Sequence, residues 1–143
     1  MLNLKNLNII NKDGLQINLK EYNKKIIGLY FSASWCPPCR NFTPILSTFY
    51  EDMIDYYDDI EIIYVSSDKT QNEFNEYWEN MTFPALSYCD REKKEELTKL
   101  YEVKQIPALV FINDNGELIT KDGKNIITNS NGNVEYLRNN LDM

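Results

Sequence analysis

The feature that most constrains this chain is a pair of cysteines between a strand-like and a helix-like segment. Ile26–Ser32 is an almost unbroken apolar run, typical of a central strand covered on both faces, and Cys36-Pro37-Pro38-Cys39 follows it. Apolar residues then recur every three or four positions as far as residue 57, which predicts an amphipathic helix starting at Pro37. Two cysteines with this spacing at such a junction form a redox pair that can close into a disulfide.

Length and charge limit the class of protein. A chain of 143 residues predicts a single domain, residues 1–143, with one continuous core. The net charge of −7 argues against nucleic acid or an anionic membrane as partner, and no stretch is apolar enough to span a bilayer. The N-terminus lacks the features of a secretory signal, and three cysteines cannot make a disulfide framework. We therefore expect a cytoplasmic protein.

The other elements follow from periodicity and turn residues. Alternation at residues 2–10 and 15–19 around a turn at residues 11–14 predicts an N-terminal β-hairpin, followed by a polar loop at 21–25. Strands are expected at 60–65, 106–112 and 117–120, with a short strand or turn at 83–88 and a turn at Asp122-Gly123. Helices are expected from a capping box at Thr70 and Glu73, at 91–101 with Leu97, Leu100 and Tyr101 buried, and near the end around residues 134–141. Strands alternating with helices predict an α/β fold: a central mixed β-sheet with helices on both faces.

The position of each cysteine predicts its role. The thiolate is the nucleophile in disulfide exchange, and a helix N-terminus lowers the pKa of a thiol placed there. Cys36 should therefore be the exposed, attacking thiol, and Cys39, one turn further in, the less accessible, resolving one. Pro37 and Pro38 remove two backbone donors and stiffen the turn, which favours closure of the disulfide. Arg40 adds positive charge nearby, or else extends into solvent. Pro44 is expected to kink the helix.

Other uses of two cysteines fit poorly. A structural zinc site needs four ligands, and the chain has no histidine and only Cys89 as a third thiol, so we expect no metal. An iron–sulfur cluster fails on the same count, and covalent haem attachment needs histidine where Arg40 stands. An inert pair in a degenerate binding module stays open. Cys89 is either a regulatory thiol or a partly buried, chemically quiet one.

The string YFSASWCPPCRNFTP around the pair resembles the thioredoxin superfamily, and within it the tryparedoxin and nucleoredoxin branch. Val65-Ser66-Ser67-Asp68 after the next strand is similar to that branch too, and Ile106-Pro107 falls where the superfamily has a cis-proline. The resemblance covers residues 20–125 in element order and implies a thioredoxin-like fold.

The resemblance also implies roles. Cys36 is the nucleophile and Cys39 resolves the mixed disulfide. Trp35 shields the pair and offers an apolar platform, unless it packs in the core, and Pro37 and Pro38 join it in contacting the substrate. A cis Pro107 would hold Ile106 for backbone pairing with the substrate chain; a trans bond at the strand entry is the alternative.

Two departures from the family pattern leave roles open. Thioredoxins proper have a buried aspartate as proton acceptor where this chain has Tyr30, as the tryparedoxin-like branch does, so the acceptor is unassigned. Asp68 could serve as a proton acceptor through a water, or could cap or precede the helix at Thr70. The branch's Met-Pro-Trp segment reads Met81-Thr82-Phe83 here, and we expect Phe83 to flank the substrate groove.

Together these observations predict a thiol-disulfide oxidoreductase. It would reduce disulfide-containing protein substrates as a monomer, without a cofactor, and would need an upstream reductase or a low-molecular-weight dithiol to regenerate it. A redox-sensing interaction module with little turnover, and a disulfide oxidase or isomerase, are the alternatives.

Overall fold

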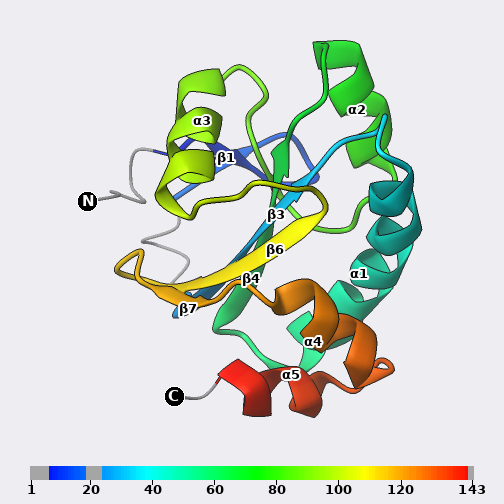
Figure 1. Ribbon diagram of the computed structural model, residues 1–143, viewed down its shortest axis with the longest axis vertical. Helices are drawn as coiled ribbons and strands as arrows, with labels where there is room; N and C mark the ends of the chain where they lie inside the picture. The colour runs from blue at the N-terminus through cyan, green and yellow to red at the C-terminus, as the bar shows by residue number, and fades with distance from the viewer. Residues whose placement is uncertain (1–6, 19–23, 142–143) are drawn as a thin grey trace.

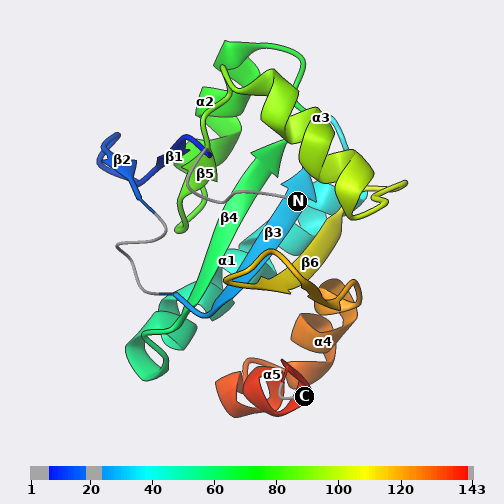
Figure 2. The ribbon, with the colours of Figure 1, turned by 90° about the vertical axis from the view of Figure 1, so that its left-hand side faces the viewer.

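The described residues form a seven-stranded sheet with helices on both faces, in the strand order β2-β1-β5-β4-β3-β6-β7. The computed structural model describes residues 7–18 and 24–141. Figures 1 and 2 show α3 on one side of the sheet and α1 on the other, with α4 and α5 packed near the lower end of α1. The α/β arrangement expected from the sequence, a central mixed sheet with helices on both faces, is confirmed.

The central strands place the cysteine pair. β3 (Ile26–Ser32) runs parallel to β4 (Ile60–Ser66) and antiparallel to β6 (Ala108–Asn113), and β7 (Leu118–Thr120) is antiparallel to β6. The carboxyl ends of β3, β4 and β7 therefore face the same edge of the sheet as the amino end of β6. The arrows of β3 and β4 run opposite to that of β6 in Figure 2. The segments that follow or precede these ends meet at one edge of the sheet.

Side chains alternate across β3, so both faces of the sheet are covered by apolar packing. Ile26 and Tyr30 pack toward α1, whereas Ile27, Leu29 and Phe31 pack toward α3. All seven residues of β3 are buried, as they are in β4. The continuous apolar run in the sequence is thus explained by burial on two faces.

The N-terminal hairpin is present but short. β1 (Ile9–Ile10) pairs antiparallel with β2 (Gln16–Ile17), and Gly14 takes a φ of +80° in the turn between them. β1 also pairs with β5 (Ala85–Leu86), the short strand expected within residues 83–88. Expectations for residues 2–6, 19 and 21–23 lie outside the described residues.

Three helices follow the predicted periodicity. α1 (Pro37–Tyr56) continues through Pro44. α2 (Gln71–Glu79) is capped by Thr70, whose hydroxyl accepts the Glu73 amide. α3 (Arg91–Leu100) buries Leu97 against the sheet, but Leu100 is 49% exposed, so its predicted burial is wrong. Leu97 and Tyr101, four residues apart, share the inner face, and Leu100 falls beside it. None of the helices within the described ranges is long and apolar enough to cross a membrane.

The C-terminal part contains a helix that the sequence did not predict. Asp122-Gly123 reads as a turn, but Asp122 is the N-cap of α4 (Gly123–Ser130). α4 packs against β6 and ends at Asn131 in the left-handed conformation (φ +52°), after which α5 (Val134–Leu141) forms as expected. A glycine stands at the first position of α4 because there is no room for a side chain: a Cβ on Gly123 would lie 2.6 Å from the Leu109 carbonyl oxygen.

We expect Gly123→Ala to lower the free energy of unfolding by about 1–3 kcal/mol, because backbone must shift to admit the methyl group. Urea denaturation measures this. Asn129→Ala, at an exposed position of the same helix, is the control and should change stability by less than about 0.5 kcal/mol. Equal effects of the two substitutions would contradict the packing argument.

Candidate functional site

The nucleophile predicted from the sequence lies at the start of α1. Cys36 is the N-cap of this helix, with Pro37 and Pro38 as its first two residues. Cys36 is more accessible than Cys39, as predicted, but it is only 6% exposed, so its description as an exposed thiol is wrong. Its Sγ donates to the Ile106 carbonyl oxygen at 3.8 Å. The thiol is therefore covered by the loop that enters β6.

The second thiol lies directly beneath the first. Cys39 is fully buried, within hydrogen-bonding reach of the Cys36 and Ser32 side chains and of the Ala33 backbone. Burial and the bond to Cys36 raise the pKa of the Cys39 thiol to about 11, against smaller opposing effects of Ser32 and Ala33. All three cysteines are free, so the structure is that of the dithiol form. Cys89 is exposed, so its expected partial burial is wrong. The pair has the unequal access that stepwise exchange requires.

A network of buried hydroxyl groups surrounds the second thiol. The Thr43 hydroxyl, one turn along α1 from Cys39, donates to the Cys39 carbonyl oxygen at 2.9 Å. It also bonds the Tyr30 hydroxyl at 2.7 Å and the Tyr77 hydroxyl at 2.6 Å, and Tyr77 bonds Ser32 at 3.1 Å. Burial raises the pKa values of Tyr30 and Tyr77, so both phenols stay protonated near neutral pH. Neutral hydroxyl groups thus surround Cys39 at the place where thioredoxins proper have a buried aspartate.

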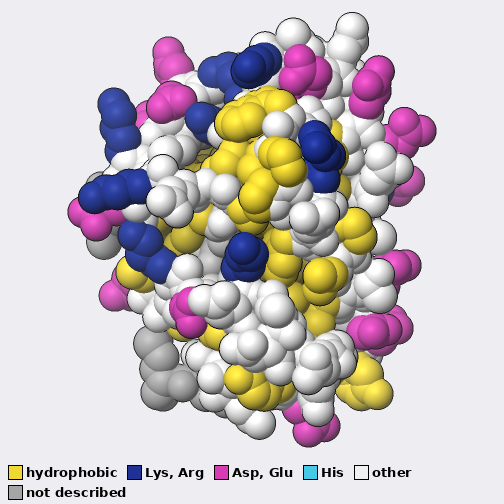
Figure 3. All heavy atoms as spheres, turned by 45° about the vertical axis from the view of Figure 1, so that its right-hand side comes forward, with side chains coloured by type: hydrophobic (Ala, Val, Ile, Leu, Met, Phe, Trp, Pro, Cys, Tyr) yellow, Lys and Arg dark blue, Asp and Glu magenta, His cyan; other side chains and the backbone are white. Residues whose placement is uncertain are grey.

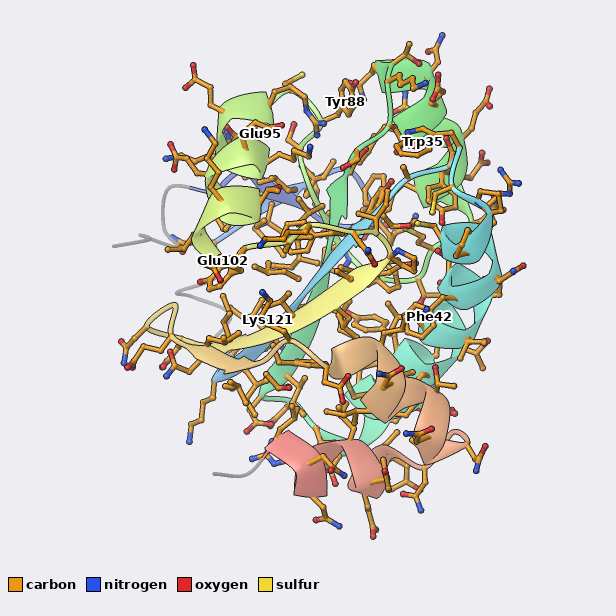
Figure 4. The ribbon with its side chains drawn as sticks, in the orientation of Figure 1. Trp35, Phe42, Tyr88, Glu95, Glu102 and Lys121 are labelled. Atoms are coloured by element: carbon orange, nitrogen blue, oxygen red, sulfur yellow. The ribbon has the colours of Figure 1, made fainter. Side chains whose placement is uncertain are left out.

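The segment before the helix is held by the loop after β4. Trp35 is 48% exposed, which excludes the core-packing alternative, and its Nε1 donates to the Ser67 carbonyl oxygen at 3.0 Å. The Ser67 amide in turn donates to the Ser32 carbonyl oxygen at 2.8 Å. Figure 4 shows Trp35 and Tyr88 at this end of the sheet, and Phe42 lower down, on the α1 side. The indole thus presents a fixed apolar surface beside the pair.

Asp68 is a structural anchor in this structure. Its buried carboxylate accepts from the Ser34 amide at 2.7 Å, the Tyr64 hydroxyl at 2.5 Å and the Ser66 hydroxyl at 2.7 Å. Asp68 precedes α2, as one of the expected alternatives has it, while Thr70 is the residue that caps this helix. Asp68 therefore ties the loop before Cys36 to the end of β4, and its contacts are with groups other than the two thiols.

Ile106-Pro107 is a cis peptide, as the family resemblance implied, and the trans alternative is wrong. Both residues are half-buried. They precede β6, whose first residue, Ala108, pairs with Phe31 near the end of β3. This register explains why the Ile106 carbonyl lies over Cys36.

Two further predicted site residues have different outcomes. Phe83 is fully buried, with its ring 6.0 Å from that of Tyr30 and 5.7 Å from that of Tyr50, so its expected place at a substrate groove is wrong. The Pro84 carbonyl accepts the Tyr64 amide, which draws the segment into the sheet and turns Phe83 inward. Arg40 does not simply extend into solvent: its guanidinium donates to the Ser34 carbonyl oxygen at 2.9 Å.

Comparisons with known proteins agree with this geometry. Residues 23–118 match a family model described as thioredoxin-like. A tryparedoxin of Trypanosoma brucei brucei is 40% identical over 113 residues, 78% of this chain and 77% of the relative. The chain belongs to the thioredoxin-like family. A solved structure of tryparedoxin II complexed with glutathionylspermidine is 34% identical, with a TM-score of 0.80 over 86% of this chain and 85% of that one.

Nucleoredoxins are also similar to this thioredoxin-like chain. Probable nucleoredoxin 1 of Arabidopsis thaliana is 36% identical over 119 residues, which are 83% of this chain but 20% of the relative. The chain thus spans about a fifth of that protein's length. The tryparedoxin and nucleoredoxin resemblance expected from the sequence is confirmed.

The hydroxyl network was missed by sequence reasoning, although part of it has a signal. Thr43 follows Cys39 by four residues on the same helix, the spacing at which a hydroxyl reaches the carbonyl one turn back. Ser32 ends β3 on the way to the pair, and so could have been suspected. Tyr77 had no such signal, because only the packing of α2 brings it there.

The raised pKa of Cys39 predicts slow alkylation at neutral pH. In a Cys36→Ala/Cys89→Ser variant, Cys39 is the single thiol, and burial, the largest cause of the shift, persists. Its rate of reaction with iodoacetamide should rise with pH around a midpoint higher than that of the same variant in urea, where a thiol titrates near ~8.5. Coincident midpoints in the folded and unfolded variant would contradict the assignment.

The burial of Phe83 predicts a change in stability. Phe83→Ala should lower the free energy of unfolding by about 3–5 kcal/mol, since a large core side chain is lost. Tyr56→Ala, which truncates a ring that is 72% exposed, is the control and should cost less than about 1 kcal/mol. Urea denaturation of both variants measures the difference, and a loss at Phe83 no larger than that at Tyr56 would place the ring at the surface.

Proposed function

We propose that this chain is a thiol-disulfide oxidoreductase that reduces disulfides in other proteins. The observation that carries the proposal is the unequal pair: Cys36 at the helix N-terminus, and Cys39 buried beneath it within hydrogen-bonding reach. Such a pair can exchange one disulfide for another without a bound cofactor. Family membership supports this direction of chemistry.

The proposed reaction has two exchanges. The Cys36 thiolate attacks one sulfur of the substrate disulfide, so that a mixed disulfide forms and the other substrate sulfur leaves as a thiolate. The Cys39 thiol loses its proton and attacks the Cys36 sulfur, which releases the second substrate thiolate and leaves a Cys36–Cys39 disulfide. Two electrons pass to the substrate, and its two thiolates are protonated.

Trp35, Pro37, Pro38, Ile106 and Pro107 form the contact surface in this proposal. Trp35, Pro37 and Pro38 are exposed beside Cys36, and the Ile106 carbonyl already contacts its thiol. A substrate segment lying along Ile106 would bring its disulfide to Cys36.

An external donor must restore the dithiol, either an upstream reductase or a low-molecular-weight dithiol. The tryparedoxin structure complexed with glutathionylspermidine supports a small thiol compound as one class to test. We further propose that the protein works as a monomer, since both cysteines come from one chain, and in the cytosol, where the pair would be kept reduced.

Reduction of insulin disulfides driven by dithiothreitol tests the proposal. The unaltered protein should accelerate precipitation of the insulin B chain, and Cys36→Ser should abolish the acceleration. Cys39→Ser should form a mixed disulfide with the substrate and stall. Cys89→Ser, which changes an exposed thiol outside the pair, is the control and should keep full turnover. Full turnover by Cys36→Ser would refute the assignment of the nucleophile.

A further inference from the structure

Lys and Arg side chains gather beside an apolar area on one face of this acidic chain. The net charge is −7, yet Figure 3 shows Lys and Arg side chains bordering a central apolar area, with Asp and Glu mostly toward the margins. Four cations belong to this face: two contact the segment around Cys36, and two line a cavity beside β6. We call them the basic rim: Arg40, Lys69, Lys104 and Lys121.

Sheet topology brings the basic rim to the cysteine pair. Lys69 follows β4 and Lys104 precedes β6, so both lie toward the edge of the sheet where β3 leads into Cys36. Lys121 directly follows β7, and the register of β7 on β6 sets it level with Val110 and Leu29, further back along the sheet. The Lys69 Nζ lies 5.6 Å from the centre of the Trp35 ring. From β4 to β7 is three strand spacings, roughly 14 Å, so Lys69 and Lys121 lie on opposite sides of β3, the strand that leads into Cys36.

Within residues 7–18 and 24–141, the basic rim has no acidic partner at ion-pair distance. Arg40 and Lys121 donate to backbone carbonyls, of Ser34 and Glu102 respectively. Among the described residues, no carboxylate forms an ion pair with any of the four. The ion pairs found in the described part of the chain join other residues: Lys93–Glu96, Lys94–Glu95 and Arg138–Asp59. The positive charge of the basic rim is thus available to a partner.

A hollow of about 340 Å³ beside β6 extends the contact surface. Lys104 and Lys121 line it together with Ala108 and Val110, and Glu102 is its one acidic lining residue. Figure 4 shows Glu102 and Lys121 on the side of β6 where α3 ends. The pairing of β6 with β7 begins at Phe111, so this part of β6 lies beyond the β7 pairing. A chain that passes Ile106 along β6 would enter the hollow between two lysines.

We infer that the preferred substrates are proteins whose segment beside the target disulfide carries Asp or Glu side chains. This inference rests on the proposed disulfide reductase function and names its substrate class. Complementary charge on both sides of the pair would speed encounter and fix the direction of the bound segment. The apolar area at the centre would cover the disulfide itself.

Two disulfide-bonded peptides of the same sequence, one with Glu and one with Lys on both sides of the target cysteine, test this. The pre-reduced protein is mixed with each, and the second-order rate constant of peptide reduction is measured by acid quench and mass spectrometry. We expect the acidic peptide to react roughly 10-fold faster at low salt. The preference should shrink toward unity at about 0.5 M NaCl.

Charge reversal locates the effect. Lys69→Glu/Lys121→Glu should abolish or invert the preference, whereas Lys25→Glu/Lys99→Glu, the same charge change at exposed positions outside the site, should preserve it. Equal rates for the two peptides with the unaltered protein would overturn the inference and leave the proposed function intact. The same loss of preference in the control double variant would also overturn the inference. Reduction of neither peptide would overturn the proposed function.

Discussion

The carboxylate of Asp68 is the constraint on which the site depends most. It receives a backbone amide from the loop that leads to Cys36 and two hydroxyls from β4, all at 2.5–2.7 Å. A buried carboxylate is costly unless its oxygens are occupied, and here they are. The loop after β4, which carries Asp68, also accepts the indole N–H of Trp35 through the Ser67 carbonyl oxygen. The ends of β3 and β4 are therefore fixed to each other, and Cys36 directly follows the segment that these bonds hold.

Around Cys39, hydroxyl groups form hydrogen bonds with one another inside an aromatic core. Tyr30 is fully buried on β3, yet its hydroxyl finds Thr43, which also holds Tyr77 and the carbonyl of Cys39. Hydroxyls donate and accept at once, so a closed set of them can be buried with little uncompensated polarity. Cys39 thereby sits in a neutral environment, in keeping with its raised pKa.

Much of this could be predicted from local sequence, where one stretch of chain determines the outcome. The apolar run of β3, the prolines after Cys36 and the capping hydroxyl of Thr70 each act over a few residues, and each appears as expected. Side-chain direction at Phe83 and the start of α4 at Gly123 depend instead on distant neighbours, Tyr50 in one case and Leu109 in the other. Likewise, Tyr77 reaches the site only because α2 packs there. A role that depends on the packing of two elements cannot be predicted from the sequence of either element alone.

The N-cap position of Cys36 sets stability against reactivity at a single residue. Serine, threonine and aspartate are favoured at this position because their oxygen accepts a first-turn amide, but the Cys36 side chain makes no capping bond to the described part of α1. With prolines at the next two positions, the Cys39 amide is the first that such an oxygen could accept. Replacing sulfur by oxygen would therefore improve the start of the helix while removing the nucleophile. At residue 36, the protein forgoes a better helix start in order to keep a thiol.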